Sequence, residues 1–244
     1  MGVKVKKCRG KVFLNLRILV IADIHSNLEA LKTVLEEAPE HDSVVCVGDV
    51  VGYGPNPNEC VDEVKALNAE CVMGNHDYAS VTDVAVGFNP YAAYAVHYTH
   101  RKLTGESLKY LSGLPRSVRF EVEGVRVAVY HGSPRAPLDE YVFPDYPSST
   151  LSRFLGMADA DLLILGHTHV PMVREVERGV VVNPGSVGQP RDGDPRASFM
   201  VLDLSGGEVD VRQFRVRYDV ERVARVMREE GLPPMLYERL FLGW

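Results

Sequence analysis

The stretch SVVCVGDVVGYG, residues 43–54, decides how the chain folds. Its apolar run Val44–Val47 is typical of a buried strand, and the run stops at Gly48-Asp49, which places a carboxylate at the carboxyl end of that strand. A carboxylate held next to an apolar core needs a compensating cation. A turn-forming aspartate after a strand would give the same pattern, so the choice between the two depends on the neighbouring segments.

The segment before this stretch ends in the same way. Leu16–Ala22 is an apolar β-type run, and alternation along the extended segment after it would point Asp23 and His25 to the same side, where they could bind one ion. Ser26–Glu29 has the spacing of a capping box, and the helix that it predicts ends before Pro39. Strand, helix and strand together predict a βαβ unit with polar residues at its carboxyl edge.

The segment after residue 54 repeats this pattern. Asn56, Pro57 and Glu59 predict a helix with an N-cap, a proline in its first turn and a second capping box. The run 70–73 is expected to be a third strand, and it ends in GNHD (74–77). One such ending is commonly only turn chemistry, but three at adjacent strand ends of one sheet indicate a site.

Residues 78–115 have a less regular, helical pattern. Asn89-Pro90 predicts the start of one helix, and a second is expected near Ser107–Leu111. His97 and His100 lie one helical turn apart, and we interpret them as solvated or packed side chains because no third ligand is near them in the sequence. We keep this segment as a candidate lid over the site.

The second half of the chain supplies further strands and three ligand-type histidines. Strands are expected at residues 117–122 and 125–130, which form a hairpin, and at 161–165, 173–177, 180–183, 199–204 and 209–216. The strand 125–130 ends in His131, and the strand 161–165 is followed by GHTH (166–169). The HxH spacing would put His167 and His169 on one side of an extended segment, although histidines two apart also occur by chance.

The Gly/Pro-rich segment NPGSVGQPRDGDPRAS (183–198) has two readings. It could offer backbone N–H groups and Arg191 or Arg196 to an anion, or it could be an ordinary connection. Farther on, Asp219 predicts the cap of a helix. The apolar run MLYERLFLGW (235–244) is expected to dock on the domain or on another subunit, so a homo-oligomer stays open.

Composition narrows the class of protein. The 244 residues are 45% hydrophobic, which suffices for the core of one large domain or two small ones. The sequence has no run of 18 or more apolar residues, so no membrane span is expected. The net charge of −6 argues against general nucleic-acid binding. We interpret the start of the chain as a tail rather than a signal peptide. The four cysteines are Cys8, Cys46, Cys60 and Cys71, and no two of them have CxxC spacing. We therefore expect reduced thiols in a cytoplasmic protein.

The residues with ligand chemistry all follow predicted strands. They are Asp23, His25, Asp49, Asn75, His131, His167 and His169, with His76 beside them. If Asp49 bridges, these oxygen and nitrogen ligands can fill two metal sites and leave a place for a shared hydroxide. A single metal would need only a smaller set and would not explain all of them.

Five motifs in this order resemble the full set of the calcineurin-like metallophosphoesterases: DxH (23–25), GD (48–49), GNHD (74–77), His131 and GHTH (166–169). The resemblance spans residues 16 to about 188, and GDVVGYGPNP and the 183–198 segment resemble the small prokaryotic phosphodiesterase branch. Gly52 stands where many relatives carry another aspartate, which bears on the substrate but not on the metals.

The resemblance implies an α/β fold, a four-layer αββα sandwich of two mixed β-sheets flanked by helices. We expect a single metallophosphoesterase domain over residues 1–244, with the helical lid at 78–115 and a C-terminal helical tail at 219–244.

The resemblance also implies which residues bind metal. One divalent ion would be held by Asp23, His25, Asp49 and His169, and a second by Asp49, Asn75, His131 and His167. Manganese is the metal that we expect first, with iron, zinc, nickel and cobalt as alternatives.

The implied reaction is phosphodiester hydrolysis of a small phosphoester or nucleotide by a metal-bridging hydroxide. His76 would protonate the leaving group, Asp77 would orient His76 or simply cap a turn, and Asn75, His76 and Arg191 would bind the substrate. A phosphomonoesterase, a protein phosphatase or a dinucleoside polyphosphate hydrolase on the same site are the alternatives. A non-catalytic scaffold, like the retromer subunit that resembles these enzymes but lacks the catalytic histidine, is disfavoured because His76 is present.

Overall fold

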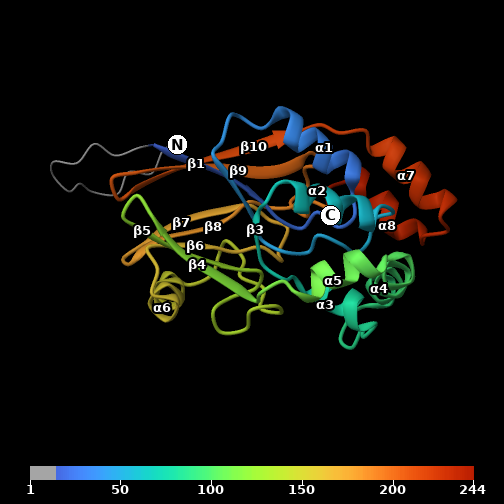
Figure 1. The fold of residues 1–244 in the computed structure, drawn as a ribbon, viewed down its shortest axis with the longest axis horizontal. Coiled ribbons are helices and arrows are strands. Elements are labelled where there is room, and N and C mark those ends of the chain that lie inside the picture. The colour runs from blue at the N-terminus through green and yellow to red at the C-terminus, as the bar shows by residue number, and fades with distance from the viewer. Residues whose placement is uncertain (1–14) are drawn as a thin grey trace.

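Two five-stranded sheets lie face to face, with helices on both outer faces (Figure 1). The computed structural model describes residues 15–244, and the tail expected at the start of the chain, with Cys8, lies outside these residues. The described part of the chain therefore forms the expected four-layer αββα sandwich of two mixed sheets.

The first sheet has the strand order β10–β9–β1–β2–β3. Its strands are β1 (Leu16–Ile21), β2 (Ser43–Cys46), β3 (Glu70–Cys71), β9 (Ala197–Ser205) and β10 (Glu208–Val216). Strands β1, β2 and β3 run parallel, whereas β9 is antiparallel to both β1 and β10. Ile21 pairs with Cys46, so the carboxyl ends of β1 and β2 lie side by side.

The second sheet has the order β4–β5–β6–β8–β7. Its strands are β4 (Ser117–Val122), β5 (Val125–Tyr130), β6 (Leu162–Ile164), β7 (Met172–Val176) and β8 (Gly179–Asn183). The three central strands run parallel, and β4 and β7 close the edges as antiparallel partners. The hairpins expected around Glu123-Gly124, Arg178-Gly179 and Gly206-Gly207 are present.

The helices cover the two outer faces and one end of the sandwich. They are α1 (Leu28–Glu37), α2 (Pro57–Ala66), α3 (Asn75–Thr82), α4 (Pro90–Lys102), α5 (Gly105–Ser112), α6 (Ser148–Ala158), α7 (Val220–Glu229), α8 (Pro234–Glu238) and the 3₁₀ turn η1 (Arg239–Phe241). Apolar side chains of α1, α2 and α5 pack on the first sheet, and those of α6 pack on the second. Helices α4, α7 and α8 share a separate apolar cluster.

Central strands are buried on both faces, which explains their continuous apolar runs. Ile18 and Val20 of β1 pack between the two sheets, while Leu19 and Ile21 pack against the helices on the other face. The polar residues that follow these strands therefore lie at the boundary of the apolar core, which covers both faces of each strand.

Both capping-box predictions are wrong. Asn27, not Ser26, caps α1, because its side chain accepts a hydrogen bond from the Ala30 N–H at 3.1 Å. At α2, Asn56 holds the N-cap position without a side-chain hydrogen bond, and the proline in the first turn begins the helix.

Two strand and helix predictions also differ from the structure. The expected third strand stops at Cys71, because β3 is an edge strand and the Met73 N–H donates to the Pro115 carbonyl at 2.8 Å. Helix α6 was not predicted, although Leu151, Phe154 and Leu155 have the spacing of one buried helical face.

The C-terminal segment docks on its own domain. Leu236 and Leu240 are buried against Tyr53 and α4, whereas Phe241 and Trp244 remain partly exposed. Among residues 15–244, no helix combines the length and the apolar character that crossing a membrane requires. The three cysteines in this range are free and buried.

Phe199 tests the packing between the first sheet and its helices. Its side chain has no exposed surface and stacks on Phe214 with ring centroids 5.2 Å apart. Phe199→Ala should lower the free energy of unfolding by about 3–5 kcal/mol in urea denaturation, because it leaves a cavity. Phe241→Ala, at a side chain that is 41% exposed, should change it by less than about 0.5 kcal/mol. Equal urea midpoints for the two variants would contradict this packing.

Candidate metal centre

The carboxyl ends of parallel strands from both sheets meet at one edge of the sandwich. Asp23 and Asp49 follow β1 and β2, and His131 and His167 follow β5 and β6. Backbone hydrogen bonds continue the strand pairing into these loops, from Asp23 N–H to the Gly48 carbonyl at 3.0 Å and from Gly166 N–H to the His131 carbonyl at 2.9 Å. All four polar side chains are buried.

Left-handed backbone is concentrated at this edge. Positive φ is uncommon outside glycine, and it costs energy that the surrounding structure must supply. Five of the predicted site residues adopt it: Asp23 (52°), His25 (49°), Asp49 (52°), His167 (67°) and His169 (59°). The prediction of extended DxH and HxH segments is therefore wrong, and His167 and His169 join different groups of side chains.

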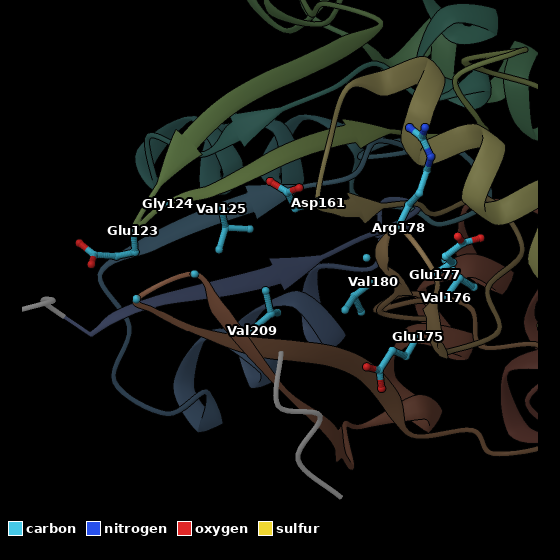
Figure 2. Close-up of a pocket in the computed structure, with 13 residues that line it drawn as sticks. Glu123, Gly124, Val125, Asp161, Glu175, Val176, Glu177, Arg178, Val180 and Val209 are labelled. Atoms are coloured by element: carbon cyan, nitrogen blue, oxygen red, sulfur yellow. The ribbon is translucent and has the colours of Figure 1, made fainter. Parts of the chain in front are cut away.

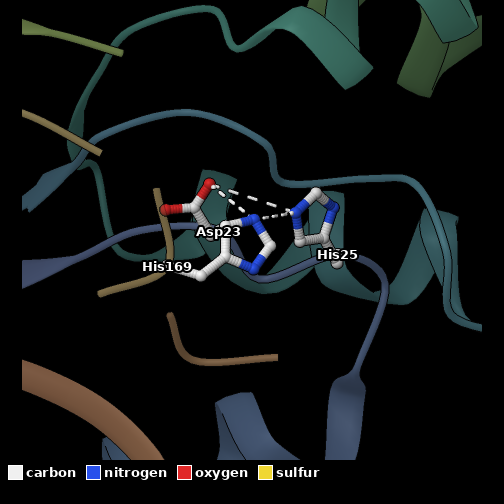
Figure 3. A group of neighbouring side chains, drawn as sticks. All are labelled: Asp23, His25 and His169. Carbon is white, nitrogen blue, oxygen red and sulfur yellow. Dashed lines mark hydrogen bonds and ion pairs between the residues drawn. The ribbon is translucent and has the colours of Figure 1, made fainter. Parts of the chain in front are cut away.

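The first group consists of Asp23, His25 and His169 (Figure 3). His25 Nε2 lies 3.0 Å from His169 Nε2 and 4.0 Å from Asp23 Oδ1, and His169 Nε2 lies 3.4 Å from Asp23 Oδ1. One carboxylate oxygen and two imidazole nitrogens thus converge from two loops, the loop after β1 and the loop after β6.

The second group consists of Asp49, His131 and His167, with Asn75 beside it. His131 Nε2 lies 3.3 Å from Asp49 Oδ2, 3.2 Å from His167 Nδ1 and 3.0 Å from Asn75 Oδ1. Asp49 Oδ2 also lies 3.6 Å from His25 Nε2, so this carboxylate joins the second group to the first.

The orientation of the imidazoles leaves their lone pairs facing one another. Backbone carbonyls face Nδ1 of three rings: Val51 at His25 (3.2 Å), Val47 at His131 (2.8 Å) and Gln189 at His169 (2.5 Å). Each Nδ1 is therefore a donor, and the neutral rings of His25 and His169 direct their Nε2 lone pairs into the first group. Two lone pairs 3.0 Å apart repel each other unless a cation or a proton lies between them. The donor set therefore fits metal ions.

Unpaired atoms and pKa shifts support this fit. Asp23 Oδ1 and His167 Nε2 are buried without a hydrogen-bond partner. Burial lowers the pKa of His25 and of His169 well below its usual value, so both rings are neutral, as ligands must be. At His131 burial is outweighed by the Asp49 carboxylate, which raises the pKa to about 10 and shows that this position favours positive charge.

His76 lies beside both groups, and one of its ring nitrogens lies within 4.8 Å of ligand atoms of His25 and Asp49. Its backbone N–H donates to Asp49 Oδ1 at 2.8 Å, and its ring contacts His25, Tyr53 and Phe88 at centroid distances of 4.4–4.9 Å. Burial lowers the pKa of His76 to about 4, so its imidazole is neutral near neutral pH in the free protein. Its Nδ1 has no hydrogen-bond partner.

Among the described residues, Asp77 makes no hydrogen bond with the His76 ring. Its carboxylate accepts hydrogen bonds from the backbone N–H groups of Gly74 and Val51, both at 3.0 Å. It therefore caps α3 and ties the loop after β2 to it, which is the alternative that the sequence left open. The close approach also depends on Gly74, where a Cβ would lie 2.0 Å from Asp49 Oδ1.

Of the two candidate arginines, Arg191 lies at the centre. Its guanidinium donates to Gln189 Oε1 at 2.9 Å and to the Tyr53 hydroxyl at 3.4 Å, and its charge acts on His25 and His169. It makes no ion pair with a carboxylate among the described residues. Arg196 instead pairs with Asp194 at 2.6 Å.

His97 and His100 stand apart from the centre, as expected. His97 Nδ1 lies 2.6 Å from Asp83 Oδ1, and His100 Nδ1 lies 2.8 Å from the Ser80 carbonyl.

Aromatic residues around the centre were missed at the sequence level. Tyr53 and Phe88 contact His76, and Tyr141 stacks on His167 with ring centroids 3.8 Å apart. Tyr53 lies inside the quoted GDVVGYG stretch and could have been noticed there. Phe88 and Tyr141 lie in segments without any motif, so only the fold brings them to the site.

A separate cavity of about 480 Å³ lies at the opposite end of the sandwich (Figure 2). The turns of the three hairpins line it, and it contains carboxylates of Glu123, Asp161, Glu175 and Glu177 together with Arg178. It contains no histidine and none of the predicted site residues. The carboxyl ends of the parallel strands therefore remain the candidate site.

Buried carboxylates and imidazoles that converge at the edge of an α/β sandwich define a class of metal-dependent hydrolases. The chain matches the calcineurin-like phosphoesterase superfamily domain over residues 16–207. It therefore belongs to the calcineurin-like phosphoesterase superfamily, a family of metal-dependent phosphoric ester hydrolases.

Individual relatives agree with this membership. An uncharacterized protein of Methanocaldococcus jannaschii is 38% identical over 245 residues, covering 93% of this chain and 98% of that protein. A probable metallophosphoesterase of Methanothermobacter thermautotrophicus is 43% identical over 102 residues, covering 41% of this chain and 53% of its own length. The crystal structure of a metallophosphoesterase from Sphaerobacter thermophilus has a TM-score of 0.81 at 37% identity and covers 94% of this chain and 99% of its own.

Gly52 offers a test of how His76 is held. A Cβ at this glycine would lie 2.7 Å from His76 Nδ1, and its φ of 105° suits no other residue. Gly52→Ala should therefore displace the His76 ring and reduce phosphoester turnover by about tenfold or more. Gly207→Ala is the matched control, because this glycine has φ 83° with nothing within 4 Å. Unchanged turnover in Gly52→Ala, or an equal loss in both variants, would contradict the contact.

Proposed function

We propose that the protein is a dinuclear phosphodiesterase that hydrolyses a small phosphoester or nucleotide. The observation that carries this proposal is the pair of carboxylate–imidazole groups joined through Asp49. A single cation would leave one group of converging acceptors uncompensated, and buried acceptors without compensation are costly.

The residues that would hold the two ions are those of the two groups. Asp23, His25 and His169 would hold one ion, Asn75, His131 and His167 would hold the other, and Asp49 would serve both. When bound, divalent ions supply a water nucleophile that is ionised near neutral pH and neutralise charge on the phosphoryl oxygens. Mixed nitrogen and oxygen donors suit manganese, iron, zinc, nickel or cobalt.

The chain's own side chains would bind the phosphoryl group and assist the leaving group. Arg191 has an unpaired positive charge at the centre and can donate hydrogen bonds to a phosphoryl oxygen. His76 lies against Asp49 but is not needed as a ligand, so its ring can carry a proton to the departing oxygen. An anionic substrate next to His76 would favour the protonated ring that burial alone disfavours.

Aromatic rings next to two different histidines of the centre support a diester over a monoester. Phe88 lies against His76, and Tyr141 lies against His167. A diester carries an organic group on each side of phosphorus, whereas a monoester carries one. One aromatic ring beside His76 and another beside His167 therefore favour a substrate with two substituents.

Chromogenic substrates test the proposal directly. Chelator-stripped protein should hydrolyse bis-p-nitrophenyl phosphate only after a divalent metal is added, and faster than p-nitrophenyl phosphate. Diadenosine tetraphosphate should be included to test the dinucleoside polyphosphate alternative. Faster turnover of the monoester would reverse the specificity, and no turnover of any phosphoester with two bound ions would favour a scaffold.

His76→Ala should reduce turnover about 10²–10⁴-fold and leave the metal content unchanged, because the ring acts as a general acid and not as a ligand. Steady-state kinetics and elemental analysis of the same preparation measure both effects. His97→Ala is the control, since that histidine is exposed and pairs with Asp83. Loss of metal in the His76 variant, or full activity, would contradict the role.

Asp49→Asn should release metal from both groups, because one carboxylate faces His25 and His131 together. Inductively coupled plasma mass spectrometry after gel filtration should find fewer than two ions per chain. Asp210→Asn on β10, far along the sheet, should keep the wild-type content. Two ions per chain in the Asp49 variant would show that this carboxylate is not shared.

A further inference from the structure

Two half-exposed aromatic rings lie directly beside the metal centre. Tyr141 is 46% exposed and Phe143 is 43% exposed, and their rings are parallel within 8° with centroids 5.9 Å apart. We refer to these two residues as the aromatic ledge. Paired, flat and partly uncovered rings of this kind are costly to leave in water, so they indicate a contact surface.

The ledge is continuous with the centre. Tyr141 stacks on the ring of His167 at 3.8 Å with an interplanar angle of 25°. Phe143 stacks in turn on Tyr141 and thereby continues the aromatic surface beyond it. A group bound on the ledge would therefore be attached to a phosphoryl group held at the centre.

The ledge is also fixed in place. Val142, between the two rings, is only 2% exposed and packs in the core between the second sheet and α6. Glu140, which precedes Tyr141, accepts hydrogen bonds from Ser133 and from the Tyr146 hydroxyl, the latter at 2.9 Å. A preformed aromatic surface binds a flat ligand without an ordering cost.

We propose that the aromatic ledge, Tyr141 and Phe143, stacks on the nucleobase of a nucleotide phosphoester whose phosphoryl group is held at the metal centre. A nucleobase is flat and has two π-faces, and aromatic side chains stack on bases of any identity. This assignment rests on the proposed function, since it places a substituent of the same phosphoester. If the base stacks on Phe143, this residue makes the protein prefer nucleotides to phosphoesters that lack a base.

Calorimetry can separate base binding from phosphate binding. Manganese-loaded protein is titrated with adenosine 5′-monophosphate and with ribose 5-phosphate, which carries the same phosphoester without the base. Stacking predicts that the nucleotide binds about tenfold or more tightly. Phe143→Ala should remove most of this difference by weakening nucleotide binding and should leave the affinity for ribose 5-phosphate unchanged.

Tyr141→Leu is the second variant, because leucine retains apolar packing on His167 and removes the aromatic ring. It should also reduce nucleotide affinity selectively. Met157→Ala is the control, at an apolar side chain on α6 that is 49% exposed, and it should bind both compounds like the wild type. Circular dichroism melting of each variant verifies that the fold is retained.

Three results would overturn the assignment: equal affinity of the wild type for the two compounds, parallel loss of both affinities in Phe143→Ala, or binding of neither compound. Hydrolysis assays run on the same samples distinguish this assignment from the proposed function. Phosphodiester turnover without base preference would reject only the ledge. Base-dependent binding without turnover would reject only the catalytic proposal.

Discussion

The repulsion among buried acceptor atoms is the constraint on which the rest of the structure depends. Asp23 and Asp49 directly follow strands that are buried on both faces. The neutral rings of His25 and His169 direct their Nε2 lone pairs at each other across 3.0 Å. A cation or a proton between these atoms relieves this convergence. The strand order, the pairing of the loops and the glycines at positions 48 and 74 bring these groups together. The fold therefore creates the concentration of acceptor atoms that cations would compensate.

Strand ends could be predicted from the sequence because apolar runs that are buried on both faces end abruptly. Val44–Val47 followed by Gly48-Asp49 is one such ending, and in the structure it lies beside the ending of β1 at Asp23. The two mixed sheets were expected from the resemblance of the ordered motifs to those of the calcineurin-like metallophosphoesterases. The edge strand β3 is shorter than predicted, because the Met73 N–H leaves the sheet and donates to the Pro115 carbonyl.

The conformation inside the loops could not be predicted, because it follows from tertiary contacts. Extended backbone was expected for DxH and HxH, yet both segments bend through left-handed residues. Asp23 and His25 still share one group, whereas His167 and His169 join different groups. Asp77 illustrates the same limit: its carboxylate is used by two backbone N–H groups, one of which belongs to the loop after β2. Tyr141 and Phe88 reach the centre from segments without a motif, so only the three-dimensional fold reveals them.

The left-handed backbone at five of the centre's residues has a consequence for mutational tolerance. Aspartate, asparagine and histidine adopt this conformation more readily than other side chains, so geometry and chemistry restrict these positions together. A β-branched or bulky replacement would lose a donor atom and also strain the main chain. Asparagine at Asp23 or Asp49 is therefore the cleaner probe, and a survey of tolerated substitutions here would measure backbone shape as much as metal affinity.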